Sequence, residues 1–213
     1  MQEIKLSVVL DSASCFSIGE GTAGEVDIEI QHDEYGLPFL NGKALKGLLH
    51  EEAAELVFAL EQAGSKGNWV QITNKIFGEP GSTADTQGTV NFGDLRLPAD
   101  FREKVISEIK ERKTTAYEVL RLLTSTRTQT AVDENGAPRP ETLRTLRIIP
   151  RETTLEASIF FDKLEHQEQI FLHSCLMALR RAGSNKSRGL GKLKISTVPS
   201  FVMKEEDFTD EGN

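Results

Sequence analysis

Residues 154–198 contain the clearest succession of strand, helix and strand, and they read TLEASIFFDKLEHQEQIFLHSCLMALRRAGSNKSRGLGKLKISTV. Apolar and polar residues alternate over 154–161, which predicts a strand. Apolar residues recur at helical spacing over 165–181, which predicts a helix. A basic, glycine-rich loop occupies 182–192, and 193–198 alternate again. This half of the chain therefore predicts a strand, a helix and a second strand.

The N-terminal half predicts the same order. Residues 4–10 alternate as a strand, and a long helix is expected after Asn41, whose side chain suits an N-cap. Residues 89–97 are a third strand candidate. With insertions removed, the chain reads strand, helix, strand twice over, which is the ferredoxin-like arrangement of the α+β class.

Several segments interrupt this order. Residues 25–31 alternate and are expected to form another strand, 74–78 a short helical turn, and 101–112 a helix. Residues 115–153 are expected to be an inserted hairpin or irregular finger, because an Asn-Gly pair at 135–136 is typical of a hairpin tip. The acidic tail, 203–213, completes a single expected domain spanning 1–213.

Composition narrows the class of protein. The chain is 38% hydrophobic and 27% charged, as ordinary globular proteins are. It contains no apolar run of the roughly 20 residues that a membrane helix needs. It also starts without a secretory pattern, so we expect a cytoplasmic protein with no membrane partner. Cys15 and Cys175 are expected to be reduced thiols, since two cysteines alone do not make a zinc site.

The charge distribution matters more than its sum. A net charge of -8 argues against nucleic acid, because phosphate binding needs Lys and Arg. However, residues 180–194 contain six basic side chains and no acid, and 121–151 contain six arginines. A protein that is acidic overall can therefore bind nucleic acid through basic loops.

Three groups of residues are candidates for RNA binding. Lys43, Lys46 and His50 share one face near the start of the predicted helix, either as a solvated face or as a phosphate-binding face at the positive helix end. In the glycine-rich loop, backbone N–H groups can approach phosphates closely, although a plain helix-to-strand turn has similar residues. The loop candidates are Lys186, Ser187, Arg188, Gly189, Gly191 and Lys192.

The inserted segment supplies the third group. Its candidate RNA contacts are Arg127, Arg139, Arg144 and Arg147. Nearby apolar side chains can act as wedges between base steps, and the alternative is a flexible surface loop. Since Phe92 is the only aromatic candidate on a central strand, we expect readout of the RNA backbone rather than of its bases.

Three stretches in this order resemble one family. They are 36–47 (GLPFLNGKALKG), 144–156 (RTLRIIPRETTLE) and 187–191 (SRGLG). The first is similar to a P-x-I-P-G-S-S-L-K-G pattern, the second to an Arg-rich segment ending in V-P-x-G-T-x-F-E, and the third to a glycine-rich loop. Together they resemble the RAMP superfamily, in particular the backbone subunits of type III CRISPR effector complexes of the Csm and Cmr kind.

The resemblance implies a modified RRM-like domain with an inserted thumb hairpin at 115–153. It implies guide (CRISPR) RNA, target RNA, neighbouring copies of the chain and other complex subunits as partners. It also implies a catalytic Asp in a pattern similar to G-x-D-N-P-V-I-x-D, which Asp27 matches within 24–33, although Ile28-Glu29 replaces the family's Asn-Pro. That residue would cleave target RNA with a divalent metal, Mg²⁺ or Mn²⁺.

The chemistry fits a single carboxylate. Magnesium usually takes one or two carboxylates together with phosphate oxygens and waters, so Asp27 can be both the metal ligand and the catalytic residue, with assistance from His32 and Asp33. A solvent-facing row of acids is the alternative for this segment. At the level of the whole protein, two alternatives remain: a catalytically silent structural or end-cap subunit, and a metal-independent endoribonuclease that processes the guide.

Overall fold

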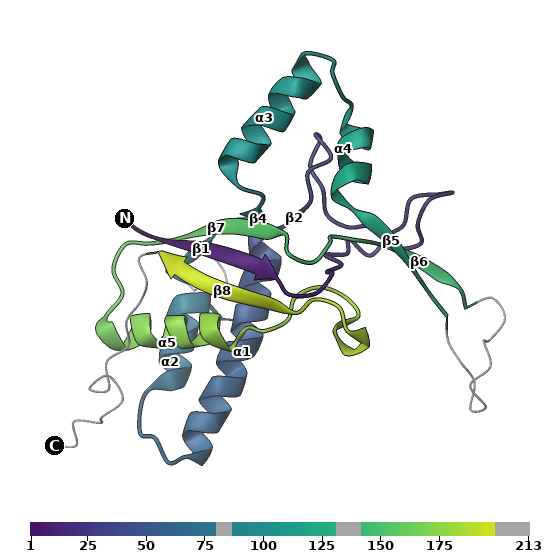
Figure 1. Cartoon of the computed structure of the whole chain (residues 1–213). Helices are drawn as coiled ribbons and strands as arrows, with labels where there is room; N and C mark the ends of the chain where they lie inside the picture. The colour runs from purple at the N-terminus through teal and green to yellow at the C-terminus, as the bar shows by residue number, and fades with distance from the viewer. Residues whose placement is uncertain (80–86, 131–141, 199–213) are drawn as a thin grey trace.

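A central antiparallel sheet organises the chain, and the computed structural model describes residues 1–79, 87–130 and 142–198 (Figure 1). The sheet order is β2 (Phe39–Leu40), β4 (Leu95–Arg96), β7 (Thr154–Phe161), β1 (Gln2–Leu10) and β8 (Leu193–Val198), and β3 (Asn91–Phe92) also pairs with β7. The N-terminal strand β1 is therefore central, with β7 and β8 as antiparallel neighbours. With β3 and β4 occupying one strand position, this is the ferredoxin-like order, and the predicted fold class is confirmed.

Three helices, α1 (Gly42–Gln62), α2 (Trp69–Phe77) and α5 (His166–Ala178), cover one face of the sheet (Figure 1). The core lies between them and the inward-facing residues of β1, such as Leu6 and Val8. Asn41 caps α1 as expected, because its side chain accepts a hydrogen bond from the Ala44 N–H at 2.8 Å. Within the described ranges, no helix has the length and hydropathy that a bilayer crossing requires.

The remaining elements lie on the other side of the sheet and beyond its end. Helices α3 (Ala99–Lys110) and α4 (Ala116–Leu123) lie above the sheet in Figure 1. Strands β5 (Ser125–Gln129) and β6 (Arg144–Ile148) pair antiparallel as a separate two-stranded sheet in the expected inserted segment. Arg139, the Asn-Gly pair at 135–136 and the acidic tail 203–213 lie outside the described residues.

The expected strand over 25–31 is not a regular strand. Its apolar residues Val26, Ile28 and Ile30 form isolated bridges to three different segments, at Thr22, Leu146 and Ser17 respectively. The alternation of the sequence marks which side chains are buried, but it does not require that they share one partner strand.

Other boundaries also differ from expectation. The candidate strand 89–97 is split into β3 and β4, and the expected turn at 74–78 belongs to the longer helix α2. Helix α5 ends at Ala178 rather than at residue 181, because the chain turns to pair with the start of β8: the Leu193 N–H donates to the Arg180 carbonyl at 3.0 Å.

Candidate nucleic-acid interface

The glycine-rich loop 182–192 is held closed by backbone hydrogen bonds. The Ala182 N–H donates to the Gly191 carbonyl and the Gly191 N–H to the Ala13 carbonyl, both at 2.9 Å. Gly191 has a φ of +80°, and a Cβ there would lie 2.1 Å from the Ala182 oxygen. Glycine is therefore required at 191 for both its backbone angle and the close approach of two chain segments.

The basic residues of this loop lie on its outer side. Lys186, Ser187 and Arg188 form the short 3-10 turn η1 (Lys186–Arg188), in which Ser187 and Arg188 are exposed and Lys186 is half-buried. Lys192 is also exposed. The Lys186 ammonium lies 3.8 Å from a carboxylate oxygen of Glu51, a distance that leaves the ammonium weakly held.

A groove runs between this loop and the first turns of α1, with a volume of about 300 Å³. Its lining mixes apolar side chains with polar and charged ones. Helix α1 contributes Ala44, Gly47, Leu48 and Glu51, the loop contributes Gly183, Ser184 and Lys186, and the rest comes from Phe16, Ser17, Gln31 and Leu40.

The three basic residues predicted on α1 do not all face this groove. At 100° per residue, Lys43 projects roughly 90° from the groove-lining face and Lys46 roughly 150° from it. The ring of His50 stacks on Phe77 of α2, with centroids 5.4 Å apart. Lys43 is exposed, Lys46 and His50 are half-buried, and none of the three is part of the groove lining.

The loop also contacts the hairpin. Arg188 Nη1 donates to Gln129 Oε1 of β5 at 3.1 Å. Gln129 pairs with Arg144 across the hairpin, so their side chains share a face, and both Arg127 and Arg144 are exposed. Sequence reasoning missed Gln129, since no sequence pattern links it to a residue that follows 59 positions later.

Arg147 differs from the other predicted arginines. Its side chain is 5% exposed, and it donates from Nε to Glu29 Oε1 and from Nη2 to Glu25 Oε2, both at 2.7 Å. A guanidinium buried against two carboxylates cannot reach a phosphate. Arg147 is therefore assigned a structural role in place of the RNA contact that the sequence predicted.

Glu29 shows the electrostatic consequence of this pairing. Burial alone would raise the pKa of Glu29, but hydrogen bonds from Arg147, the Ile30 N–H and Thr22 together lower that pKa below its ordinary value. The carboxylate is therefore ionised wherever the chain is folded near neutral pH.

Asp27 is exposed beside β6 of the hairpin. Its Oδ2 accepts a hydrogen bond from the Thr145 N–H at 2.7 Å, and its own N–H donates to the Thr145 carbonyl at 2.8 Å. It borders an open hollow of about 420 Å³ formed by residues 21–27 and Thr145. Within the part of the chain that the structure describes, no residue donates to Oδ1 of Asp27, so this oxygen faces solvent.

The structure does not bring the other predicted assistants to Asp27. Asp33 Oδ1 accepts the N–H groups of Tyr35 and Leu37, both at 3.0 Å, and thus stabilises a turn. The exposed His32 ring lies 3.2 Å from the Asp33 carbonyl oxygen. Among the described residues, no group of three or more His, Cys, Asp or Glu is placed to hold a metal. Asp27 fits only a metal whose remaining ligands come from phosphates and water.

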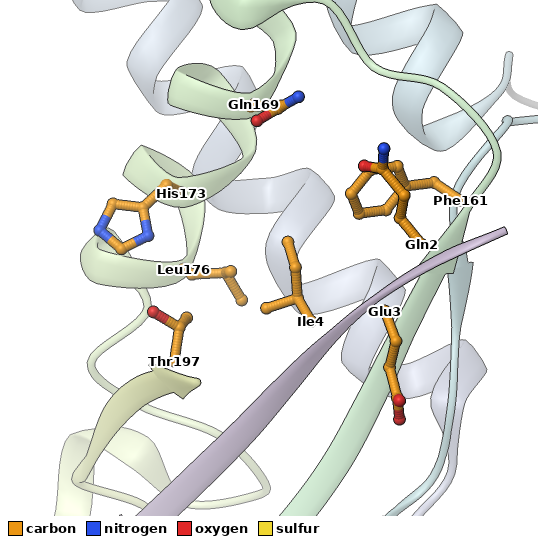
Figure 2. Close-up of a pocket in the computed structure, with 8 residues that line it drawn as sticks. All are labelled: Gln2, Glu3, Ile4, Phe161, Gln169, His173, Leu176 and Thr197. Atoms are coloured by element: carbon orange, nitrogen blue, oxygen red, sulfur yellow. The ribbon is translucent and has the colours of Figure 1, made fainter. Parts of the chain in front are cut away.

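A second hollow lies at the opposite end of β1 and β8, with a volume of about 160 Å³ (Figure 2). Ile4, Phe161 and Leu176 give it a mainly apolar lining, with His173 of α5 beside them. Burial lowers the pKa of His173, so the ring is neutral near pH 7. The hollow has no Lys or Arg in its lining and is not part of the basic interface.

Comparisons with known proteins agree with this architecture. The family model described as the RAMP superfamily matches residues 17–194. A chain of the type III-B Cmr-beta complex bound to cognate target RNA is 12% identical, with a TM-score of 0.66 over 93% of this chain and 98% of that chain. The apo state of that complex gives 12% identity and a TM-score of 0.64, with 92% and 97% covered.

A chain of a type IV-B CRISPR complex is 13% identical, with a TM-score of 0.60 over 99% of this chain and 98% of that one. No curated protein matches the chain. At these identities the solved structures establish a shared fold, and the family model establishes the relationship.

Proposed function

The chain belongs to the RAMP superfamily, and from that premise we propose that it is an RNA-binding backbone subunit of a CRISPR ribonucleoprotein of the type III kind. Similar chains occur in type III-B and type IV-B complexes, and this chain covers 97–98% of their length. The observation that carries the proposal is the placement of the β5–β6 hairpin. Arg188 of the glycine-rich loop contacts one of its strands, and Asp27 is bound to the other.

The proposed ligand along the groove is the sugar-phosphate backbone of a guide RNA. Lys186 lines the groove, and the exposed Arg188 and Lys43 follow or precede lining residues closely in the chain, so they add positive charge near it. Base stacking on the sheet is disfavoured, because Phe92 already stacks on Phe77 with ring centroids 5.6 Å apart. Target RNA would pair with the guide, and neighbouring copies and other subunits would continue the groove.

We propose further that Asp27 gives the assembled complex a metal-dependent endoribonuclease activity on target RNA. A bound Mg²⁺ or Mn²⁺ would supply charge stabilisation at the cleaved phosphate. Asp27 would hold the metal through Oδ1, while the Thr145 N–H fixes the orientation of the carboxylate through Oδ2. Two strand spacings, roughly 10 Å, separate the Asp27 segment from β5, so guide contacts and cleavage would flank the same hairpin.

A catalytically silent subunit is the second candidate, and one contact favours it. The hydrogen bond from Thr145 gives Asp27 a structural use, the capping of β6, that needs no metal. Substituting Asp27→Asn separates the two candidates, because the amide oxygen still accepts the Thr145 N–H while the carboxylate charge is removed. Loss of magnesium-dependent target cleavage by the assembled complex would support catalysis, and unchanged cleavage would leave the silent subunit.

RNA binding is tested on the full chain by filter binding with a guide-length single-stranded RNA over a range of salt concentrations. Arg188→Ala should weaken binding and lower the slope of log K against log salt by about 0.7, the value for one lost phosphate contact on a single strand. Lys104→Ala, an exposed lysine on α3, is the matched control and should leave affinity and slope unchanged. Equal curves for Arg188→Ala and the wild type would refute the proposed groove.

A further inference from the structure

We infer that Arg147 and Glu29 are positioning residues, which join the segment carrying Asp27 to the β5–β6 hairpin so that the two move as one body. This inference rests on the proposed function in one respect: it says how the position of Asp27 along a target RNA is set.

Arg147, Glu29 and Glu25 form an ion-pair network. One guanidinium, that of Arg147, binds Glu29 through Nε and Glu25 through Nη2 at 2.7 Å each. The Glu29 side chain is 4% exposed, and its oxygens also accept the Ile30 N–H and the Thr22 hydroxyl, both at 3.0 Å. Both oxygens of Glu29 are thus engaged, so its charge is bound in a single geometry.

Main-chain hydrogen bonds join the same two segments. The Asp27 N–H donates to the Thr145 carbonyl at 2.8 Å, and the Arg147 N–H donates to the Ile28 carbonyl at 3.0 Å. Ile28 also forms a parallel bridge with Leu146. Residues Asp27 and Ile28 therefore lie along the outer edge of β6, although the sequence between them and β6 is more than 110 residues long.

Because of these hydrogen bonds, Asp27 moves together with the hairpin when the molecule bends. Its main chain and its side chain both bind Thr145, and neither binds α1 or the central sheet among the described contacts. A tilt of the hairpin would therefore carry Asp27 with it. Any contact between the hairpin and a guide–target duplex would fix the carboxylate at a constant distance from that contact.

The buried charges of Arg147 and Glu29 explain why the Asp27 segment and the hairpin are joined in one arrangement. Breaking a buried ion pair by removing one partner is strongly unfavourable, so the Arg147–Glu29 pair resists separation of the two segments. Arg147 and Glu29 also cannot contact RNA directly, because their side chains are 5% and 4% exposed. Their influence on cleavage must therefore pass through Asp27.

The test uses the assembled complex with guide and target RNA, and compares Glu29→Gln and Arg147→Met with Lys75→Met. Lys75 forms an ion pair with the buried Glu168 at 2.5 Å between α2 and α5, remote from the hairpin, and so controls for general destabilisation. Glu29→Gln and Arg147→Met should bind guide and target within about twofold of the wild type. Their single-turnover cleavage at saturating target should fall at least tenfold or shift to neighbouring phosphates, and Arg147→Lys should restore part of the rate.

A second measurement does not depend on catalysis. Hydrogen exchange of peptides covering 20–30 and 142–149 should accelerate together in Arg147→Met and stay slow in Lys75→Met. Unchanged exchange in Arg147→Met would overturn the joining of the two segments.

The outcomes separate this inference from the proposed function. If Asp27→Asn abolishes cleavage while Glu29→Gln and Arg147→Met cut at the wild-type rate and position, the positioning inference is wrong and the proposed nuclease stands. If Asp27→Asn cuts normally, both the nuclease and the positioning of a catalytic group are wrong. A loss of cleavage that is equal in Lys75→Met would also overturn the inference, since it would show general destabilisation.

Discussion

A methyl group added at Gly191 should open the glycine-rich loop, whereas the same change at Gly189 should not. Both residues have a φ of +80°, so alanine at either position costs about 1 kcal/mol for the left-handed backbone. At Gly189 the new Cβ meets nothing within 4 Å, but at Gly191 it would lie 2.1 Å from the Ala182 oxygen.

The clash at Gly191 determines how much more stability Gly191→Ala loses than Gly189→Ala. Restoring an ordinary contact requires the two segments to separate by about 1 Å. That movement breaks the two hydrogen bonds made by Gly191, to Ala182 and to Ala13, which contribute about 1 kcal/mol each. We therefore expect the free energy of unfolding to fall by about 3 kcal/mol for Gly191→Ala and about 1 kcal/mol for Gly189→Ala.

Urea unfolding followed by fluorescence of Trp69, the single tryptophan, measures both values. This residue stacks on Phe171 with ring centroids 5.9 Å apart, so its emission reports unfolding of the helical layer. Guide RNA affinity should fall at least tenfold for Gly191→Ala, because Arg188 is displaced, and stay within about threefold for Gly189→Ala. Equal losses of stability in the two variants would refute the argument from close approach.

Acid titration, thiol labelling and helix capping provide three more tests. The lowered pKa of Glu29 means that its carboxylate stabilises the fold above its unfolded pKa, about 4.3, and that this contribution is lost as pH falls through the lower folded pKa. Glu29→Gln should therefore flatten the acid side of the stability curve measured by urea unfolding, and an equally steep curve would contradict this. Burial raises the pKa of Cys15 to about 11 and that of Cys175 to about 12, so iodoacetamide near pH 8 should label neither thiol until urea unfolds the chain, as read by mass spectrometry. Asn41→Ala should lower the free energy of unfolding by about 1 kcal/mol through loss of the α1 cap, and an unchanged urea midpoint would exclude that role.

The parts of the fold that follow local rules could be predicted from the sequence. Strands β1, β7 and β8 show the alternation of a half-buried sheet, and Asn41 precedes α1 as an N-cap should. Helix α4 was missed, although Thr115 and Glu118 form a capping box that the sequence displays as Thr-x-x-Glu. That signal was present and could have been used.

The parts that depend on distant partners could not be predicted in this way. The sequence does not distinguish Arg147 from Arg127 and Arg144. Only the folded chain places Glu25 and Glu29 around Arg147. The alternation at Val26, Ile28 and Ile30 likewise records burial without naming the bridge partners. The candidate Asp27 was predicted by resemblance to a family pattern, while its bond to Thr145 is visible only in three dimensions.

The central position of β1 has a consequence for how the chain folds during its synthesis. Val8 pairs with Leu155 on one side and with Ile195 on the other, so both neighbours of β1 are synthesised long after β1 itself. At about 5–20 residues per second, β1 leaves the ribosome roughly 10–30 s before β7 exists to cover it. During that interval its main-chain edges are open to other chains, and Glu3 and Lys5 are the charges that oppose such pairing. A nascent chain stalled before residue 193 would keep one edge of β1 uncovered, which makes aggregation, rather than loss of RNA contacts, the expected defect of a chain that lacks β8.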